Sequence, residues 1–334
     1  MQRSTAVNVF LAFLLGGVFL YLAARNVAWT DLVAAFGRFD ARWLLPAVLV
    51  SLAIMVLRAW RWQLELLPLE RIPLARLWVV CAVAYTAINL LPARLGEVVR
   101  PWLLSRRSGI RFSSVVGNLI VEKTMDSIVI AFYVLLGLLV TENLPTWVRR
   151  GAVFPAVGAA LLAAVTALLW WRGEPFVRRR VVGFLPERFG EGILRVTRSL
   201  LAGMSVLPDP KLLSGVAVIS VVLWFLPILS SYIVILAFDF RVPFQAALLV
   251  FIFIGFGTAL PQAPGMVGLY QYACVLALGL FGVPQADALA YGLVLNALQL
   301  FTIVAQGLVA LPFAGVKLED LLRRPAASPV GQDA

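Results

Sequence analysis

Long uninterrupted apolar runs constrain this chain more than any other feature of its sequence. The runs continue for about 17 to 25 residues, the length at which a helix crosses the ~30 Å hydrocarbon core of a bilayer. Hydrophobic residues make up 62% of the chain and charged residues 13%, whereas about a quarter of a soluble domain is charged. A membrane β-barrel would instead alternate apolar and polar residues over ~10-residue strands. The sequence therefore predicts an all-α polytopic membrane protein.

The runs predict about six transmembrane helices and two helical hairpins that are broken at mid-length. The spans are expected at roughly 7–24, 43–64, 113–141, 153–171, 212–238 and 286–311. The hairpins are expected at 74–106 and 244–281, and each is interrupted by Pro and Gly. The sequence leaves open whether these hairpins are re-entrant or cross the membrane fully.

The placement of Lys and Arg predicts the orientation, because cytoplasmic loops retain positive charge. With the N-terminus inside, most of the 28 basic residues lie in cytoplasmic segments, including the stretch 172–211 and the residues Arg58, Arg61, Arg71 and Arg76. We expect a multi-pass protein of the cell inner (plasma) membrane with both termini cytoplasmic. The alternative, eight or more full spans with the N-terminus outside, moves 58–76 to the wrong face. The net charge of +11 is spread over short loops, so nucleic acid is not an expected partner.

Under this topology the chain is one transmembrane domain, 1–322, built from two inverted halves. The halves are about 1–141 and 153–312, and each contains two spans, a broken hairpin and a third span in that order. A disordered tail is expected at 323–334. Both hairpins carry Leu-Pro with Gly four residues after the Pro, at Pro92 and Gly96 and at Pro261 and Gly265. Paired interrupted segments in inverted halves point to the midplane site of a transporter. Two ordinary proline kinks are the alternative.

Two further segments have an amphipathic pattern that suits the membrane surface. The segment 30–43 mixes large apolar residues with Asp and Arg, and 174–207 is basic. In 174–207 the apolar residues fall near helical spacing, at Ile193, Leu194, Leu200, Leu201 and Met204. A basic amphipathic helix tends to lie on an anionic leaflet. A charged loop that only fixes topology is the alternative.

The break of the first hairpin predicts an anion site. Pro92 cannot continue a helix, and Gly96 lets the backbone turn where a side chain would obstruct. The helix that restarts near Gly96 offers free amide hydrogens and its positive dipole end. Arg94 adds a forked donor suited to phosphate. The alternative is that Arg94, Glu97 and Arg100, each three apart, pair among themselves. The candidate binding residues here are Asn89, Arg94, Gly96, Glu97 and Arg100.

A second polar group lies within the third predicted span. Asn118, Glu122 and Asp126 are spaced by four, so they share one face of a helix. A charge in hydrocarbon costs about 2.5 to 3.5 kcal/mol, so this face must point into the protein or a cavity. Lys123 is adjacent and can neutralise one carboxylate. The two acids can bind a cationic group, pair with the arginines of the first hairpin, or carry protons.

The second hairpin has the same break chemistry without charges. The break residues are Pro261, Pro264, Gly265 and Gly268. Gln262, Tyr270 and Gln271 can form hydrogen bonds without the desolvation cost of ions. Any site here is built from dipoles, and Tyr270 and Gln271 are its candidate residues.

Three stretches together resemble the lysylphosphatidylglycerol synthase transmembrane-region family, a flippase-like domain that includes uncharacterised UPF-type membrane proteins. The stretches are NLLPARLGEVVR, VEKTMD and PQAPGMVGLYQ. The family pattern Pro-x-Arg-x-Gly-Glu-x-x-Arg is matched at Pro92, Arg94, Gly96, Glu97 and Arg100. Its Glu-Arg-x-x-Asp pattern is matched at Glu122 and Asp126, with Lys123 in place of Arg. Its late Pro-Gly-Gly-x-Gly-x-x-Glu pattern is matched at Pro264, Gly265 and Gly268, with Met266 replacing a Gly and Gln271 replacing the Glu.

The resemblance covers nearly the whole chain and implies a translocase that moves a lipid headgroup by alternating access. Arg94, Arg100 and the helix end at Gly96 would hold a phosphate, and Glu122 and Asp126 would hold a cationic group or couple to protons. The expected partner is an anionic phospholipid or lipid phosphate. In the fused relatives a separate soluble domain makes the lipid, so this chain is not expected to do so. Gln271 in place of the Glu speaks against a cationic lipid and leaves a polyprenyl phosphate or another phospholipid as the cargo.

Two other functions stay open. In the first, Glu97, Glu122 and Asp126 serve as acid, base or nucleophile of an intramembrane enzyme acting on a lipid phosphate. The chain has no His and no clear metal constellation, so we expect no enzyme, no metal and no cofactor. In the second, the chain is a non-transporting subunit of an envelope lipid or glycolipid pathway, and 172–198 docks a cytoplasmic enzyme. Cys81 and Cys274 fall in apolar runs and are expected to be reduced packing residues. The oligomeric state is left open.

Overall fold

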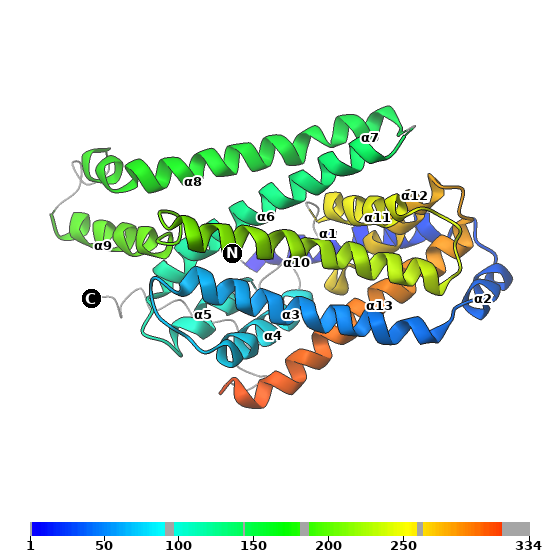
Figure 1. The fold of residues 1–334 in the computed structure, drawn as a ribbon, viewed down its shortest axis with the longest axis horizontal. Coiled ribbons are helices and arrows are strands. Elements are labelled where there is room, and N and C mark those ends of the chain that lie inside the picture. The colour runs from blue at the N-terminus through cyan, green and yellow to red at the C-terminus, as the bar shows by residue number, and fades with distance from the viewer. Residues whose placement is uncertain (1, 91–96, 143, 181–186, 259–262, 316–334) are drawn as a thin grey trace.

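The computed structural model describes residues 2–90, 97–142, 144–180, 187–258 and 263–315. These residues form helices and connecting loops, and they contain no β-strand (Figure 1). Five helical stretches are long and apolar enough to cross a membrane, and a bent pair at the N-terminus supplies a sixth. The predicted all-α polytopic class and number of spans are confirmed.

The long helices lie close to the predicted spans, and most run along the long dimension of the molecule (Figure 1). They are α1 (Gln2–Ala24), α3 (Leu44–Leu66), α6 (Phe112–Val140), α8 (Val153–Arg180), α10 (Pro210–Ala237) and α13 (Gln285–Ala310). The start of α10 is typical: Asp209 accepts hydrogen bonds from the amides of Lys211 and Leu212 at 2.9 and 3.1 Å, and Pro210 follows. A capping Asp followed by Pro favours a helix start.

Short elements lie at the ends of the long helices. They are α2 (Trp29–Gly37), η1 (Ala41–Trp43), α7 (Thr146–Gly151) and η5 (Leu311–Phe313). The axis of α2 is bent by 83° from that of α1, which agrees with a segment that leaves the span and runs along the membrane surface. Arg38, which ends α2, forms an ion pair with Asp287 at the start of α13. This pair ties the two elements together at one end of the molecule.

Both hairpins are divided into two helices, as predicted. The first comprises α4 (Leu74–Leu90) and α5 (Val99–Ser105). The second comprises α11 (Phe244–Gly257), the 3-10 turn η4 (Pro264–Met266) and α12 (Leu269–Gly279). Residues 91–96 and 259–262 between these helices lie outside the described residues, as does the tail from 316. With 17 and 14 residues, α4 and α11 are shorter than the ~20 residues of a full span.

Two hydrophobic cores occupy the two ends of the molecule. One packs α4 and α5 against the end of α3 and the end of α13. The other packs α11 and α12 against the start of α13 and the second half of α10. Figure 1 shows the two hairpins toward opposite ends of the molecule. The equivalence of the halves, with the domain bounds that go with it, stays a prediction.

The predicted surface segment 174–207 needs correction. Its first residues belong to α8, which continues to Arg180, and the amphipathic helix is α9 (Glu187–Gly203). The apolar side of α9 packs against α6 and α8, and Met204 just beyond it is buried. Gly117 of α6 permits this approach, because a Cβ there would lie 1.9 Å from the carbonyl oxygen of Leu200. Protein therefore covers the apolar face that the sequence alone assigned to a lipid leaflet.

Candidate functional site

The polar face of α6 points into the protein. Asn118 is fully buried, Glu122 is 1% exposed, and the side chain of Asp126 is 14% exposed. Lys123 lies on the exposed side of the same helix and forms no ion pair with these carboxylates, whose ion pairs within the described residues are with arginines. The prediction of one buried polar face is confirmed, and its counter-charges come from other helices.

The first counter-charge is Arg61 of α3, which is buried between both acids. Its Nη1 lies 2.5 Å from Oδ1 of Asp126, and its Nη2 lies 3.1 Å from Oε1 of Glu122. Its Nη1 also donates a hydrogen bond to the hydroxyl of Ser220 on α10, at 3.2 Å. One guanidinium therefore connects α3, α6 and α10 inside the molecule.

The second counter-charge is Arg100 of α5. Its Nη1 lies 2.7 Å from both carboxylate oxygens of Glu122. Its guanidinium carbon lies 3.9 Å from the centroid of the Trp62 ring, a distance at which the ring face attracts a cation. Glu122 is thus held by two arginines, and charged hydrogen bonds of this kind offset the cost of burying a carboxylate. The pairing of the first hairpin with the third predicted span is confirmed at Arg100.

Two tryptophans extend this network. Nε1 of Trp62 donates to Oδ1 of Asn118 at 2.9 Å, and Nε1 of Trp224 donates to Oδ1 of Asp126 at 2.8 Å. Because Trp62 lies on α3 and Trp224 on α10, each polar residue of the α6 face contacts a residue of another helix. We call the set Arg61, Trp62, Arg100, Asn118, Glu122 and Asp126 the ionic network.

Glu65 lies one turn beyond Arg61 on α3 and is 0% exposed. Neither of its carboxylate oxygens accepts a hydrogen bond. Its nearest cation is Arg61, whose Nε lies 3.6 Å from Oε1. A buried carboxylate without donors is costly, so this acid has binding capacity that the described residues leave unused.

Arg58 lies one turn before Arg61 on α3 and differs from the two arginines of the network. Its guanidinium carbon lies 4.0 Å from the centroid of the Tyr85 ring on α4. The guanidinium carbon of Arg100 lies 5.9 Å from the same centroid, so both cations approach one aromatic ring. Among the acids of the described residues none forms an ion pair with Arg58, and its Nε is buried without a hydrogen bond.

The second break forms a separate hydrogen-bonded group. Gly265 and Gly268 have φ angles of 65° and 87°, which residues with a side chain rarely adopt. Oε1 of Gln271 accepts from the amide of Gly268 at 2.7 Å, and its Nε2 lies 3.3 Å from Oδ1 of Asn296. Nδ2 of Asn296 donates to the carbonyl of Gly265 at 2.9 Å. The amide of Gln271 is therefore occupied in holding the break, and Tyr270 beside it is buried.

The structure brings together Arg100, Glu122 and Asp126 among the predicted site residues. Asn89 instead donates to the carbonyl of Tyr85 on its own helix, at 2.8 Å, and Glu97 is half-buried just before α5. The remaining predicted residues Pro92, Arg94, Gly96 and Pro261 lie outside the described residues. Their binding roles stay predictions. Within the described residues no group of three or more His, Cys, Asp or Glu is placed to hold a metal.

Sequence reasoning missed Arg58, Arg61, Trp62 and Glu65. We assigned Arg58 and Arg61 to the cytoplasmic charge, and this was wrong for Arg61, which is buried in the network. A signal was present: these residues fall inside or just after the predicted span 43–64, at spacings of three and four. Such spacing places charges on one face of a helix, the pattern that led us to the face of α6.

These features define a class: a polytopic helical membrane protein with two broken hairpins and a buried ionic network beside one of them. The family model described as the lysylphosphatidylglycerol synthase TM region matches residues 9–307, and the chain belongs to this family.

Two relatives are similar to the chain. A UPF0104 membrane protein of Methanothermobacter thermautotrophicus is 22% identical over 86% of this chain and 90% of its own length. The glycosyltransferase AglD of Haloferax volcanii is 26% identical over 73% of this chain and 44% of its own length. The chain therefore matches less than half of AglD. No solved structure gives a significant match.

Proposed function

We propose that this protein translocates the headgroup of an anionic phospholipid or a polyprenyl phosphate across the membrane. The observation that carries the proposal is Arg58, a cation inside a membrane helix that no acid of the described residues neutralises. Arg58 lies within α3, and ionisable residues within transmembrane helices are costly to bury and mark a functional site. A lipid phosphate is the partner that supplies the missing charge and that the membrane itself provides.

The geometry redistributes the roles that the sequence suggested. Arg100 was the expected phosphate ligand, but Glu122 occupies its Nη1 at 2.7 Å. We therefore propose Arg58 as the principal phosphate ligand, and the predicted roles of Arg94 and Gly96, which lie outside the described residues, stay predictions. Glu65, whose oxygens accept no hydrogen bond, is the proposed acceptor for a proton or for a cationic part of a headgroup.

We further propose a transport role rather than a catalytic one, because Glu122 and Asp126 are engaged by arginines rather than free to act as acid, base or nucleophile. The two hairpins would open alternately to the two leaflets, as inverted halves do in other transporters. The proposed location is the inner (plasma) membrane with both termini cytoplasmic.

The test is a liposome assay with purified protein. Phosphatidylglycerol labelled on an acyl chain is reconstituted, and a membrane-impermeant quencher reports the lipid in the outer leaflet. We expect Arg58→Gln to slow exchange at least tenfold, since a hydrogen bond to a charged group contributes about 1.5 to 3 kcal/mol. Arg149→Gln, which removes an exposed arginine of α7, is the matched control and should exchange like the wild type.

Two outcomes would contradict the proposal. One is a wild-type protein that moves phosphatidylglycerol, phosphatidic acid and a polyprenyl phosphate no faster than empty liposomes do. The other, an Arg58→Gln variant that exchanges all three lipids at the wild-type rate while empty liposomes do not, would refute Arg58 as the phosphate ligand on which the proposal rests.

The similarity to AglD favours a second candidate function. AglD is named a glycosyltransferase, and the matched part is 44% of its length. We propose as the alternative that the chain serves an envelope glycolipid pathway as a membrane subunit without transport of its own. The basic end of α8, with Arg178, Arg179 and Arg180, would then dock a cytoplasmic enzyme. Co-purification of one enzyme in fixed ratio, together with no lipid exchange, would favour this function over translocation.

A further inference from the structure

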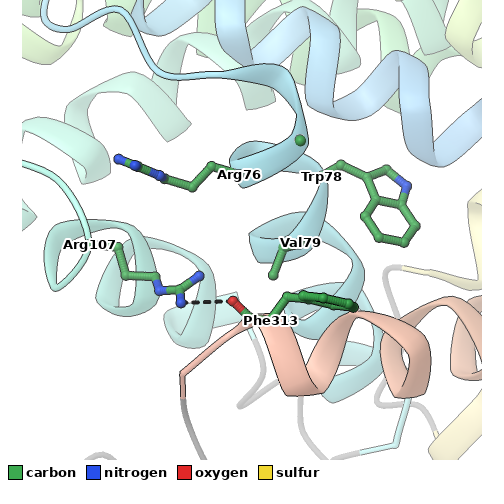
Figure 2. Close-up of a pocket in the computed structure, with 6 residues that line it drawn as sticks. Arg76, Trp78, Val79, Arg107 and Phe313 are labelled. Atoms are coloured by element: carbon green, nitrogen blue, oxygen red, sulfur yellow. Dashed lines mark hydrogen bonds between the residues drawn. The ribbon is translucent and has the colours of Figure 1, made fainter.

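A surface groove lies at the end of the molecule formed by the first hairpin (Figure 2). Its volume is about 640 Å³. It is bounded by the first two turns of α4, the connection from α5 to α6, and η5 at the end of α13. The lining residues are Ala75, Arg76, Trp78, Val79, Arg107 and Phe313. None of them belongs to the ionic network, so this is a second place on the molecule.

One side of the groove is positively charged. Nη2 of Arg107 donates to the carbonyl oxygen of Phe313 at 2.8 Å, which fixes this guanidinium and satisfies a carbonyl at a helix end. No acid of the described residues forms an ion pair with Arg76 or Arg107. Glu70, an acid of this region, instead accepts the amide of Gly109 at 2.9 Å. The positive end of the α4 dipole adds to the two charges.

The other side of the groove is apolar. Figure 2 shows the rings of Trp78 and Phe313 on one side and the side chains of Arg76 and Arg107 on the other, with Val79 between them. Phe313 is 67% exposed. Tryptophan gathers at the level of the lipid headgroups, because its ring is apolar and its indole N–H is polar, and Phe313 adds an exposed apolar ring beside it.

We propose that this groove binds the phosphate of an anionic phospholipid taken from the adjoining leaflet. Arg76 and Arg107 would hold the phosphate, and Trp78 and Phe313 would lie against the glycerol and the upper acyl chains. A soluble phosphate would use the charged side alone and leave the aromatic side exposed to water. The residues that line the groove do not include Arg58, the proposed ligand for translocation. Lipid can therefore bind here whether or not the protein transports lipid.

Native mass spectrometry of the full-length protein tests the proposal. The protein is incubated in detergent with dioleoylphosphatidylglycerol or with dioleoylphosphatidylcholine, and the bound lipid is counted. Each basic residue near a membrane surface contributes about a fivefold preference for anionic lipid. We therefore expect Arg76→Gln/Arg107→Gln, introduced into Arg58→Gln so that the proposed translocation site does not contribute, to retain roughly 25-fold less phosphatidylglycerol than Arg58→Gln alone, with phosphatidylcholine unchanged. Arg149→Gln/Arg150→Gln, which removes two exposed arginines of α7, is the matched control and should bind like the wild type.

Three further measurements keep the proposal falsifiable. Arg107 holds Phe313, so Arg76→Gln alone covers the case in which the double variant fails to fold, and it should lower retention roughly fivefold. Inorganic phosphate at the same phosphate concentration should leave the lipid bound, and displacement by it would overturn the assignment to a lipid. Equal retention of phosphatidylglycerol by wild type and Arg76→Gln would overturn the site itself. Phosphatidylglycerol bound here by a protein that exchanges no lipid would refute translocation and leave this site standing.

Discussion

Glu122 and Glu65 are both buried carboxylates, yet their surroundings differ. Both carboxylate oxygens of Glu122 lie 2.7 Å from Nη1 of Arg100, and Glu122 also forms an ion pair with Arg61. Glu65 accepts no hydrogen bond, and Arg61 approaches it only through Nε at 3.6 Å. Breaking a buried ion pair leaves a charge without compensation, whereas neutralising a poorly compensated carboxylate removes a desolvation cost.

The two acids should therefore respond differently to neutralisation. Glu122→Gln leaves Arg100 buried without its partner, and we expect it to lower the free energy of unfolding by about 3 to 5 kcal/mol. Glu65→Gln loses no hydrogen bond, and we expect a change of no more than about 1 kcal/mol, the value of one ordinary hydrogen bond. The melting temperatures of both variants, measured in one detergent, report the difference.

The control for this pair is Glu142→Gln, an exposed loop carboxylate that should leave the melting temperature unchanged. A melting temperature of Glu65→Gln as low as that of Glu122→Gln would mean that Glu65 is charged and fully paired with Arg61. In that case Glu65 is no longer available to a proton or a ligand.

At the residue scale, sequence reasoning found four of the six residues of the ionic network and missed Arg61 and Trp62. The spacing of four marked the face of α6 because those residues lie deep in an apolar run, where a charge must be buried in protein. Arg58 and Arg61 lie near the end of their run, where a long side chain can also reach the membrane surface. The contacts of Arg61 with Asp126 and Ser220 show that its side chain is buried in the protein and does not reach the membrane surface. Such tertiary contacts cannot be read from a single sequence.

At the element scale, the crossing of α6 and α9 depends on two glycines. A Cβ on Gly117 would lie 1.9 Å from the carbonyl oxygen of Leu200, and a Cβ on Gly203 would lie 1.9 Å from that of Ser114. Each glycine thus meets backbone of the opposite helix, which cannot move aside as a side chain can. Small residues permit such close packing of membrane helices.

Gly117→Ala and Gly203→Ala should therefore separate the two helices. Overpacking at such a contact costs about 1 to 3 kcal/mol, so we expect a lower melting temperature and faster hydrogen exchange of the α9 amides. Gly192→Ala is the matched control on the same helix, because a Cβ at Gly192 meets no atom within 4 Å. It should stabilise α9 slightly, since Ala favours helix over Gly by up to about 1 kcal/mol. Unchanged exchange in both crossing variants would show that α9 does not dock on α6 in the membrane.

The packing of α6 against α9 also illustrates why the bounds of the helices were easier to predict from the sequence than their packing partners. Run lengths placed most starts and ends of the spans close to those observed, because bilayer thickness sets the length of a helix, although α8 continues to Arg180, beyond the predicted end at 171. The amphipathic pattern of α9 predicted an apolar face but not what covers it, since protein and lipid are equally apolar partners. The close approach of the α6 and α9 backbones at Gly117 and Gly203 is a tertiary contact, and hydrophobic periodicity along the sequence does not reveal such contacts.

At the scale of the whole molecule, the two hairpins lie at opposite ends with a core around each (Figure 1). The sequence predicted the two broken hairpins from the apolar runs and the repeated Leu-Pro pattern. It did not predict that α13 joins both cores, the start packing with α11 and α12 and the end with α4 and α5. Such long-range packing follows from the fold and not from any local pattern.

The ionic network also changes the argument for orientation. Arg61 is buried, so it no longer counts among the charges that hold the end of α3 on the cytoplasmic side. Arg71, Arg76, Arg106 and Arg107 remain at this end of the molecule, outside the spans, as do the arginines at the end of α8. Charges near the ends of spans determine orientation, so the predicted orientation does not depend on Arg61.

Thiol labelling tests that orientation on the whole molecule. Cys81 and Cys274 are free and fully buried, as expected for packing residues, so they should react slowly and give a low background. Single cysteines are introduced at two exposed positions, Arg149→Cys on α7 and Gly192→Cys on α9, which lie at opposite ends of α8 (Figure 1). In sealed vesicles of known orientation, a membrane-impermeant maleimide should label Arg149→Cys only from the external side and Gly192→Cys only from the cytoplasmic side.

Labelling of both cysteines from one side would mean that α8 does not cross the membrane, and labelling with the sides exchanged would reverse the orientation that the arginines predict. In that reversed case the groove of Arg76 and Arg107 would face the external leaflet, and the lipid that it meets first would come from there.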